Sequence, residues 1–192
     1  SNSNHKKTVT ISVIDLSFRK DLKKYNDLYR SKLSDICRWY IDNDYVVNLV
    51  GFCKYEYDDI MIEKIVNDIP YPQNRSISKT IYRGNINKIL DIFSNSEIII
   101  GTRFHSIILG FCLRKKVLPI IYNEKTINLL VDIGFCGEYI DISKMANFDA
   151  REIAEIADLN NPIDIAAQTR ESIKQFMGLD KEIQNNLSKA VI

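Results

Sequence analysis

The chain has 192 residues, enough for one well-buried domain and too few for two ordinary domains. Lys and Arg number 26 against 25 Asp and Glu, so the formal net charge is +1, which disfavours nucleic acid and anionic membrane surfaces as partners. Hydrophobic residues make up 45% and charged residues 27%, the composition of a folded protein and not of a disordered chain.

Three features of the sequence bear on the extent of the domain and on its location. Residues 1–7 are polar, and we expect them to be disordered or derived from an expression tag, which leaves 8–192 as a single α/β domain. The apolar runs are far shorter than the roughly 20 residues that cross a bilayer, so no membrane span is expected. The cysteines form no C-x-x-C pair, so no metal site is expected. We expect free thiols, and therefore a cytoplasmic protein; the cysteines are Cys37, Cys53, Cys112 and Cys136.

Short β-branched segments alternate with segments of three- and four-residue apolar periodicity. Parallel strands need crossover connections, so this alternation predicts a doubly wound parallel sheet with helices on both faces. In that architecture ligands bind outside the carboxyl ends of the strands. The predicted strands are 9–14, 45–52, 79–82, 97–100, 117–122 and 139–140, the predicted helices are 21–42, 58–67, 85–93, 104–112 and 124–134, and a final helical segment is expected over 161–190.

The strongest functional signal follows the fourth predicted strand, in the sequence Gly101-Thr102-Arg103-Phe104-His105. We expect Thr102 to cap the next helix, with free backbone N–H groups and the positive end of the helix dipole favouring a phosphate or carboxylate. Arg103 would add a planar fork of donors, and His105 would serve as an acid or base. An alternative stays open, in which His105 binds a backbone carbonyl and Arg103 pairs with a carboxylate on a neighbouring helix.

Further candidate residues follow other predicted strands and would face the same edge of the sheet. Tyr122 and Lys125 follow the fifth strand, Arg83 the third and Arg19 the first. Each alone is more typical of a solvent-exposed side chain than of a binding site, but together they predict a cationic rim. Asp58 and Asp59 are adjacent at a predicted helix start, where acidic residues usually serve the helix dipole.

Several common catalytic motifs do not occur in the sequence. It contains no G-x-G-x-x-G, G-x-x-x-x-G-K-[ST], G-x-S-x-G or H-E-x-x-H segment. These absences disfavour a dinucleotide oxidoreductase, a P-loop NTPase, an α/β-hydrolase and a zincin.

Residues 96–134 resemble the polysaccharide pyruvyltransferase family. The resemblance rests on three features: the strand that leads into Gly101-Thr102-Arg103-Phe104-His105-Ser106, the strand Val117-Leu118-Pro119-Ile120-Ile121-Tyr122 followed by Lys125, and a helix that ends at Asp132-Ile133-Gly134. The order of the preceding strands agrees more loosely.

The resemblance implies a bacterial enzyme of surface or exopolysaccharide biosynthesis. It would transfer a pyruvyl group from phosphoenolpyruvate, with no other cofactor, to a pair of sugar hydroxyls as a ketal. By the matched motif, Arg103 would bind an anionic group of phosphoenolpyruvate and His105 would be the acid/base, with Tyr122 and Lys125 nearby. Arg19 is the candidate for an arginine that the family often carries at the end of the first strand.

The same resemblance implies a Rossmann-like half of a GT-B-type fold with C-terminal helices. The chain would then be the C-terminal, donor-binding domain of a longer enzyme, inactive without an N-terminal domain that helps to bind a lipid- or nucleotide-linked saccharide acceptor. Two alternatives remain open. One is a nucleotide-sugar glycosyltransferase or epimerase domain that uses Glu124 or Glu138 on a ribose, and the other is a non-catalytic interaction domain in which Arg103 and His105 are satisfied internally.

Overall fold

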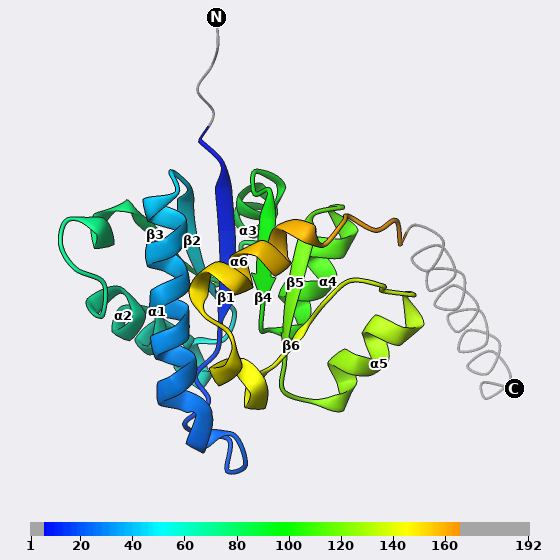
Figure 1. Ribbon diagram of the computed structural model, residues 1–192, viewed down its shortest axis with the longest axis horizontal. Coiled ribbons are helices and arrows are strands. Elements are labelled where there is room, and N and C mark those ends of the chain that lie inside the picture. The colour runs from blue at the N-terminus through cyan, green and yellow to red at the C-terminus, as the bar shows by residue number, and fades with distance from the viewer. Residues whose placement is uncertain (1–5, 166–192) are drawn as a thin grey trace, which may run out of the picture.

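The computed structural model describes residues 6–165, whose six strands form one parallel sheet in the order β3-β2-β1-β4-β5-β6 (Figure 1). The β-branched residues of β1 place it at the centre, where Val9 pairs with Val47 of β2 on one side and with Ile98 of β4 on the other. The strands are β1 (Thr8–Val13), β2 (Val46–Gly51), β3 (Ile77–Ile81), β4 (Ile98–Gly101), β5 (Lys116–Ile121) and β6 (Ile140–Asp141).

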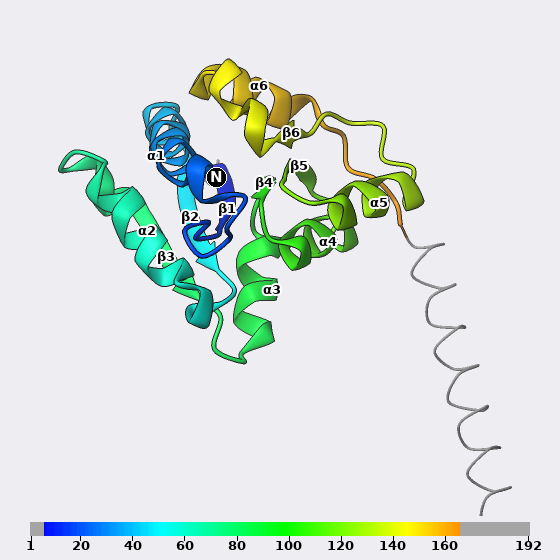
Figure 2. The ribbon, with the colours of Figure 1, turned by 90° about the horizontal axis from the view of Figure 1, so that it is seen from below.

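Helices cover both faces of the sheet, and each face has its own apolar core (Figure 2). One core packs α1, α2 and α6 against the sheet, and the other packs α3, α4 and α5. All four residues of β4 are buried, as expected for a parallel strand covered on both sides. The helices are α1 (Asn26–Asp42), α2 (Asp58–Asn67), α3 (Ile86–Ser94), α4 (Phe104–Cys112), α5 (Glu124–Asp132) and α6 (Ala150–Leu159).

The strand order fixes where a ligand can bind. From β1 the chain passes through α1 on one face toward β2, whereas from β4 it passes through α4 on the other face toward β5. The loops after β1 and β4 therefore diverge, and such a switch point is where open α/β sheets form their ligand crevice. The predicted doubly wound, Rossmann-like sheet is confirmed.

Some predicted boundaries were wrong. Strand β3 begins at Ile77, two residues before the predicted start, because the exposed Ser78 and Lys79 of this edge strand conceal its apolar pattern. A short 3-10 helix (Lys23–Tyr25) occupies the expected first turn of α1. Residues 161–165 are irregular, and the rest of the predicted segment 161–190 lies outside the described residues, as do residues 1–5 of the expected tag. Within 6–165, no helix is long and apolar enough to cross a membrane.

Gly101 ends β4 at a point where α4 packs directly on the strand. A Cβ atom there would lie 2.7 Å from Ile107 Cγ1 and 3.1 Å from Ser106 Oγ. We expect Gly101→Ala to lower the free energy of unfolding by about 1–3 kcal/mol, because α4 must shift to admit the methyl group. Urea denaturation followed by circular dichroism measures this, with the exposed Ser94→Ala as control. Equal stability of the two variants would contradict the close packing.

Candidate functional site

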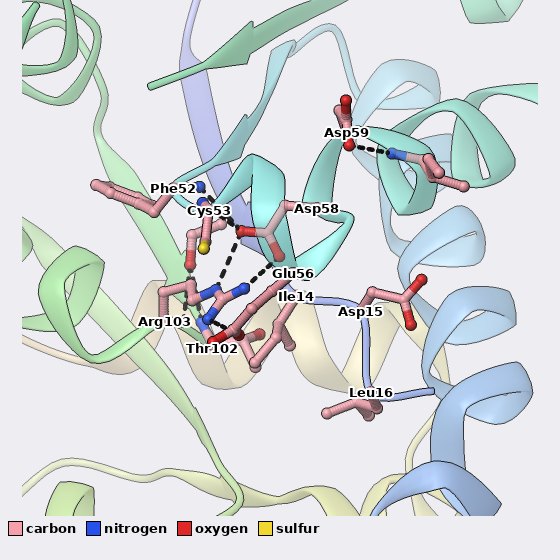
Figure 3. A network of polar contacts seen from close by, with 12 residues as sticks. Ile14, Asp15, Leu16, Phe52, Cys53, Glu56, Asp58, Asp59, Thr102 and Arg103 are labelled. Atoms are coloured by element: carbon pink, nitrogen blue, oxygen red, sulfur yellow. Dashed lines mark hydrogen bonds and ion pairs between the residues drawn. The ribbon is translucent and has the colours of Figure 1, made fainter. Parts of the chain in front are cut away.

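Arg103 lies at the start of α4 and is held by a buried carboxylate (Figure 3). Its Nε donates to Asp58 Oδ2 at 3.1 Å, and its Nη2 donates to Asp58 Oδ1. Asp58, in the first turn of α2, is fully buried and also accepts the backbone N–H groups of Phe52 at 3.0 Å and Cys53 at 2.9 Å. Asp58 therefore connects the end of β2 to the start of α4.

This pairing keeps the guanidinium charged although its side chain is only 10% exposed. Burial acts to lower the pKa of Arg103, but the hydrogen bonds and charge of Asp58, and then of Glu56, outweigh it and raise the pKa. A two-pronged carboxylate contact suits the planar guanidinium and fixes its orientation. The third nitrogen, Nη1, faces the loops after β1 and β2, where it donates to Glu56.

Glu56 lies between two arginines at that point. One oxygen, Oε2, accepts from Arg103 Nη1 at 2.6 Å and from Arg19 Nη2 at 3.2 Å. Burial acts to raise the pKa of Glu56, but the hydrogen bonds and charges of Arg103 and Arg19 outweigh it and lower the pKa. Unlike Asp58, the Glu56 side chain is 44% exposed. Guanidinium groups from the loops after β1 and β4 thus converge on a single, accessible carboxylate oxygen.

Arg19 also connects this cluster to the loop after β5. Its guanidinium carbon lies 5.1 Å from the centre of the Tyr122 ring, a cation–π contact. Tyr122 in turn lines a pocket of about 220 Å³ between the loops after β1, β5 and β6, together with Glu124 and Asp141. The structure therefore brings Arg103, Arg19 and Tyr122 together at the carboxyl edge of the sheet.

The helix start is arranged differently from the prediction. Arg103, and not Thr102, is the residue that caps α4, and its side chain makes no capping hydrogen bond. The Thr102 side chain is buried and its Oγ1 accepts from the hydroxyl of Tyr29 at 2.9 Å. The expectation that Thr102 caps the helix was wrong because this contact directs its side chain into the core. Buried Gly101 likewise makes room for α4.

Only part of the helix N-terminus remains available for an anion. Ser12 Oγ accepts the backbone N–H groups of Thr102 at 3.0 Å and Arg103 at 3.2 Å. Within residues 6–165, the backbone N–H groups of Phe104 and His105 have no acceptor. Since α4 has nine residues, its dipole adds partial positive charge at these two groups.

His105 is exposed, and no side chain or backbone group of residues 6–165 hydrogen-bonds to its ring. Its ring contacts that of Phe104 edge to face, with 6.0 Å between the ring centres. Lys125 Nζ lies 4.1 Å from the centre of the Phe104 ring, so His105 and Lys125 flank this side chain. Arg103 is satisfied internally, as the interaction-domain alternative requires, but His105 is not.

The remaining predicted residues lie apart. Arg83 is exposed after β3, two strands away from β1, and has no contact with the cluster within the described residues. Glu138, one of two acidic residues considered for a ribose, precedes β6 and lies at the opposite end of that strand from the cluster. Sequence reasoning missed Glu56 and assigned Asp58 to the helix dipole. Both residues follow β2. The available signal was that these acidic residues, like Arg19 and Arg103, come after predicted strands and therefore lie at the same edge of the sheet.

The fold of the described residues is that of a Rossmann-like domain of GT-B type. It is similar to E. coli ADP-heptose lipopolysaccharide heptosyltransferase II, with 10% identity and a TM-score of 0.56 over 81% of this chain and 46% of that one. It is also similar to a variant of the Thermobaculum terrenum O-GlcNAc transferase, with 9% identity and a TM-score of 0.50 over 91% of this chain and 32% of that one. The chain thus spans less than half the length of either structure.

The family of the chain follows from its sequence. The family model described as polysaccharide pyruvyl transferase matches residues 4–124, well over half of the chain. The chain belongs to this family, and the match includes Arg19, Glu56, Asp58, Arg103 and His105 but ends one residue before Lys125. A comparison with curated protein sequences finds no match.

The two acidic residues that hold Arg103 should differ sharply in their contribution to stability. We expect Asp58→Asn to lower the free energy of unfolding by about 3–5 kcal/mol, because it leaves a buried guanidinium with only the exposed Glu56 as a charged partner. Glu56→Gln, at a 44% exposed position, should lower it by no more than about 1 kcal/mol. Urea denaturation of both variants measures the difference. An Asp58→Asn protein as stable as the Glu56→Gln protein would show that the pair is not buried.

Proposed function

We propose that this domain binds phosphoenolpyruvate at the switch point between β1 and β4 and supplies the donor half of a pyruvyltransferase site. The observation that carries the proposal is the convergence of Arg19 and Arg103 on one carboxylate oxygen, that of Glu56. The protein's own carboxylate thus occupies a position suited to an anionic ligand. The family of the chain supports transferase chemistry at this position.

The two acidic residues would have different roles in donor binding. Asp58 is fully buried, holds two backbone N–H groups and orients Arg103, so it stays in place. Glu56 is accessible, so the carboxylate or phosphate of the donor can replace it between Arg19 and Arg103. The second anionic group of the donor can use the N–H groups of Phe104 and His105, where the dipole of α4 favours negative charge.

His105 is the proposed acid/base. In the reaction, the methylene carbon of phosphoenolpyruvate gains a proton, a first sugar hydroxyl forms a C–O bond at C2, and a second hydroxyl displaces phosphate to close the ketal. One hydroxyl proton replaces the proton given to the methylene carbon, and the other leaves with phosphate. An exposed imidazole beside the bound anion can pass these protons.

The acceptor and the rest of the enzyme belong to the same proposal. Both structural neighbours are more than twice as long as the matched part of this chain. We therefore propose that an N-terminal domain faces the carboxyl edge of the sheet and helps to bind a lipid- or nucleotide-linked saccharide. The isolated domain would bind the donor without turning it over.

Donor binding can be measured on this chain by calorimetric titration with phosphoenolpyruvate. We expect Arg19→Ala to weaken binding at least about tenfold, because a charge-assisted contact to the anion is lost. His105→Ala should keep the affinity within about threefold but abolish turnover in the full-length enzyme. Arg151→Ala, at an exposed arginine on α6, is the control.

Two results would count against the donor assignment. One is a flat titration with phosphoenolpyruvate at low salt. The other is tighter binding of uridine diphosphate, which would favour the nucleotide-sugar alternative, with Glu124 in the pocket beside Tyr122 as the candidate ribose ligand.

Replacement of Glu56 by a neutral isostere tests whether the donor competes with this side chain. We expect Glu56→Gln to bind phosphoenolpyruvate about three- to tenfold more tightly, because a neutral amide competes less well for the two guanidinium groups. The matched control is Glu63→Gln, at an exposed glutamate of α2 that pairs with Lys79. Weaker binding by Glu56→Gln would show that Glu56 positions the arginines and is not displaced.

A further inference from the structure

Two aromatic side chains stack at the same edge of the sheet, on the outside of the molecule. Phe18, in the loop after β1, lies with its ring centre 4.6 Å from that of Tyr57, in the loop after β2, and the ring planes differ by 17°. Phe18 is 66% exposed and Tyr57 is 41% exposed. We call this pair the aromatic platform. Each ring covers only one face of the other, and much of the Phe18 ring remains in contact with solvent.

The aromatic platform lies directly beside the proposed donor site. Phe18 precedes Arg19 and Tyr57 follows Glu56, so the two loops are joined by two neighbouring contacts, one aromatic and one ionic. A ligand stacked on the platform would therefore have its polar groups next to the Arg19–Glu56 ion pair.

Tyr57, one half of the platform, has a backbone conformation that tyrosine rarely adopts. Tyr57 has φ 60° and ψ 28°, in the left-handed region that is unfavourable for a bulky side chain. This conformation closes the 3-10 turn Lys54–Glu56 and starts α2, which places Glu56 and Tyr57 side by side. Tyr55 in the same turn is 95% exposed. Unfavourable backbone and clustered exposed apolar side chains both occur preferentially at functional sites.

We propose that the aromatic platform binds a pyranose ring of the saccharide acceptor. One face of a pyranose ring presents C–H bonds, which pack on an aromatic face, while its hydroxyls point outward to polar partners. The Arg19–Glu56 pair lies beside the platform in the unliganded domain, and Glu56, once the donor has displaced it from the arginines, offers an acceptor for such hydroxyls. This assignment deepens the proposed function, because it places the acceptor beside the donor. The local charges of Arg19 and Glu56 balance, which suits a neutral sugar better than a charged polymer.

Ligand-observed NMR on this chain tests the proposal. The probes are methyl β-D-galactopyranoside and methyl β-D-glucopyranoside at millimolar concentrations, and the open-chain polyol mannitol serves as a probe without a ring face. We expect saturation transfer from the protein to the ring protons of at least one glycoside, and none to mannitol. Phe18→Ala should reduce this transfer at least about fivefold and Phe18→Trp should retain it, since a larger aromatic face still stacks. Tyr139→Ala is the matched control, at a 45% exposed tyrosine that precedes β6.

The outcomes separate this proposal from the proposed function. No transfer to either glycoside, or equal transfer in Phe18→Ala, would overturn the platform assignment, while the phosphoenolpyruvate titration still decides the donor site. Phe18-dependent glycoside binding without phosphoenolpyruvate binding would support the platform and overturn the donor assignment. A dimer in sedimentation analysis that Phe18→Ala dissociates would also overturn the assignment, because a second copy would then cover the platform.

Discussion

The buried ion pair of Arg103 and Asp58 is the contact on which the candidate site depends. The loops after β1 and β4 leave the sheet toward opposite faces, so the sheet alone does not hold their side chains together. Asp58, anchored to the end of β2 by two backbone N–H groups, holds the Arg103 side chain across β1. Because a desolvated charge without a partner is very unfavourable, this pair must persist in the folded protein. It therefore fixes where the remaining nitrogen of Arg103, Nη1, points.

Two serine hydroxyl groups at the turn into α4 determine which backbone N–H groups remain open to a ligand. Ser12 accepts from the first two N–H groups of the turn into α4, while Ser106 Oγ, which lies 2.6 Å from Ser12 Oγ, donates to the Arg103 carbonyl at 2.6 Å. These contacts satisfy buried polar groups, which would otherwise destabilise the turn. They also occupy the N–H groups of Thr102 and Arg103, so that those of Phe104 and His105 remain for the anion in the proposed site. The contacts that stabilise the strand-to-helix turn thus also limit which backbone N–H groups the proposed ligand can use.

The sequence predicted the fold well because each strand and helix carries its own local pattern. The uncharged run at Ile98–Ile100 and the periodic apolar residues of α1 needed no information from elsewhere in the chain. The edge strand β3 was less predictable, because its exposed residues break the pattern. The site was predicted only in part for a different reason. That Arg103 pairs with Asp58, 45 residues away, follows from the order β2-β1-β4, which no local pattern contains. Arg83 was grouped with the other arginines for the same reason, although two strands separate it from them.

The pairing also changes what the near-neutral charge of the chain means at this site. The cationic rim expected from the sequence is not bare, because Glu56 and Asp58 already neutralise Arg19 and Arg103. In the proposed donor site a ligand would therefore exchange with Glu56, and a ligand with a single carboxylate would gain little over the side chain that it replaces. A ligand with a second anionic group gains more, because the N–H groups of Phe104 and His105 are available to it. In the proposed site, exchange of one carboxylate for another would thus favour small ligands with two anionic groups, and this selectivity would come from Glu56 as much as from the arginines.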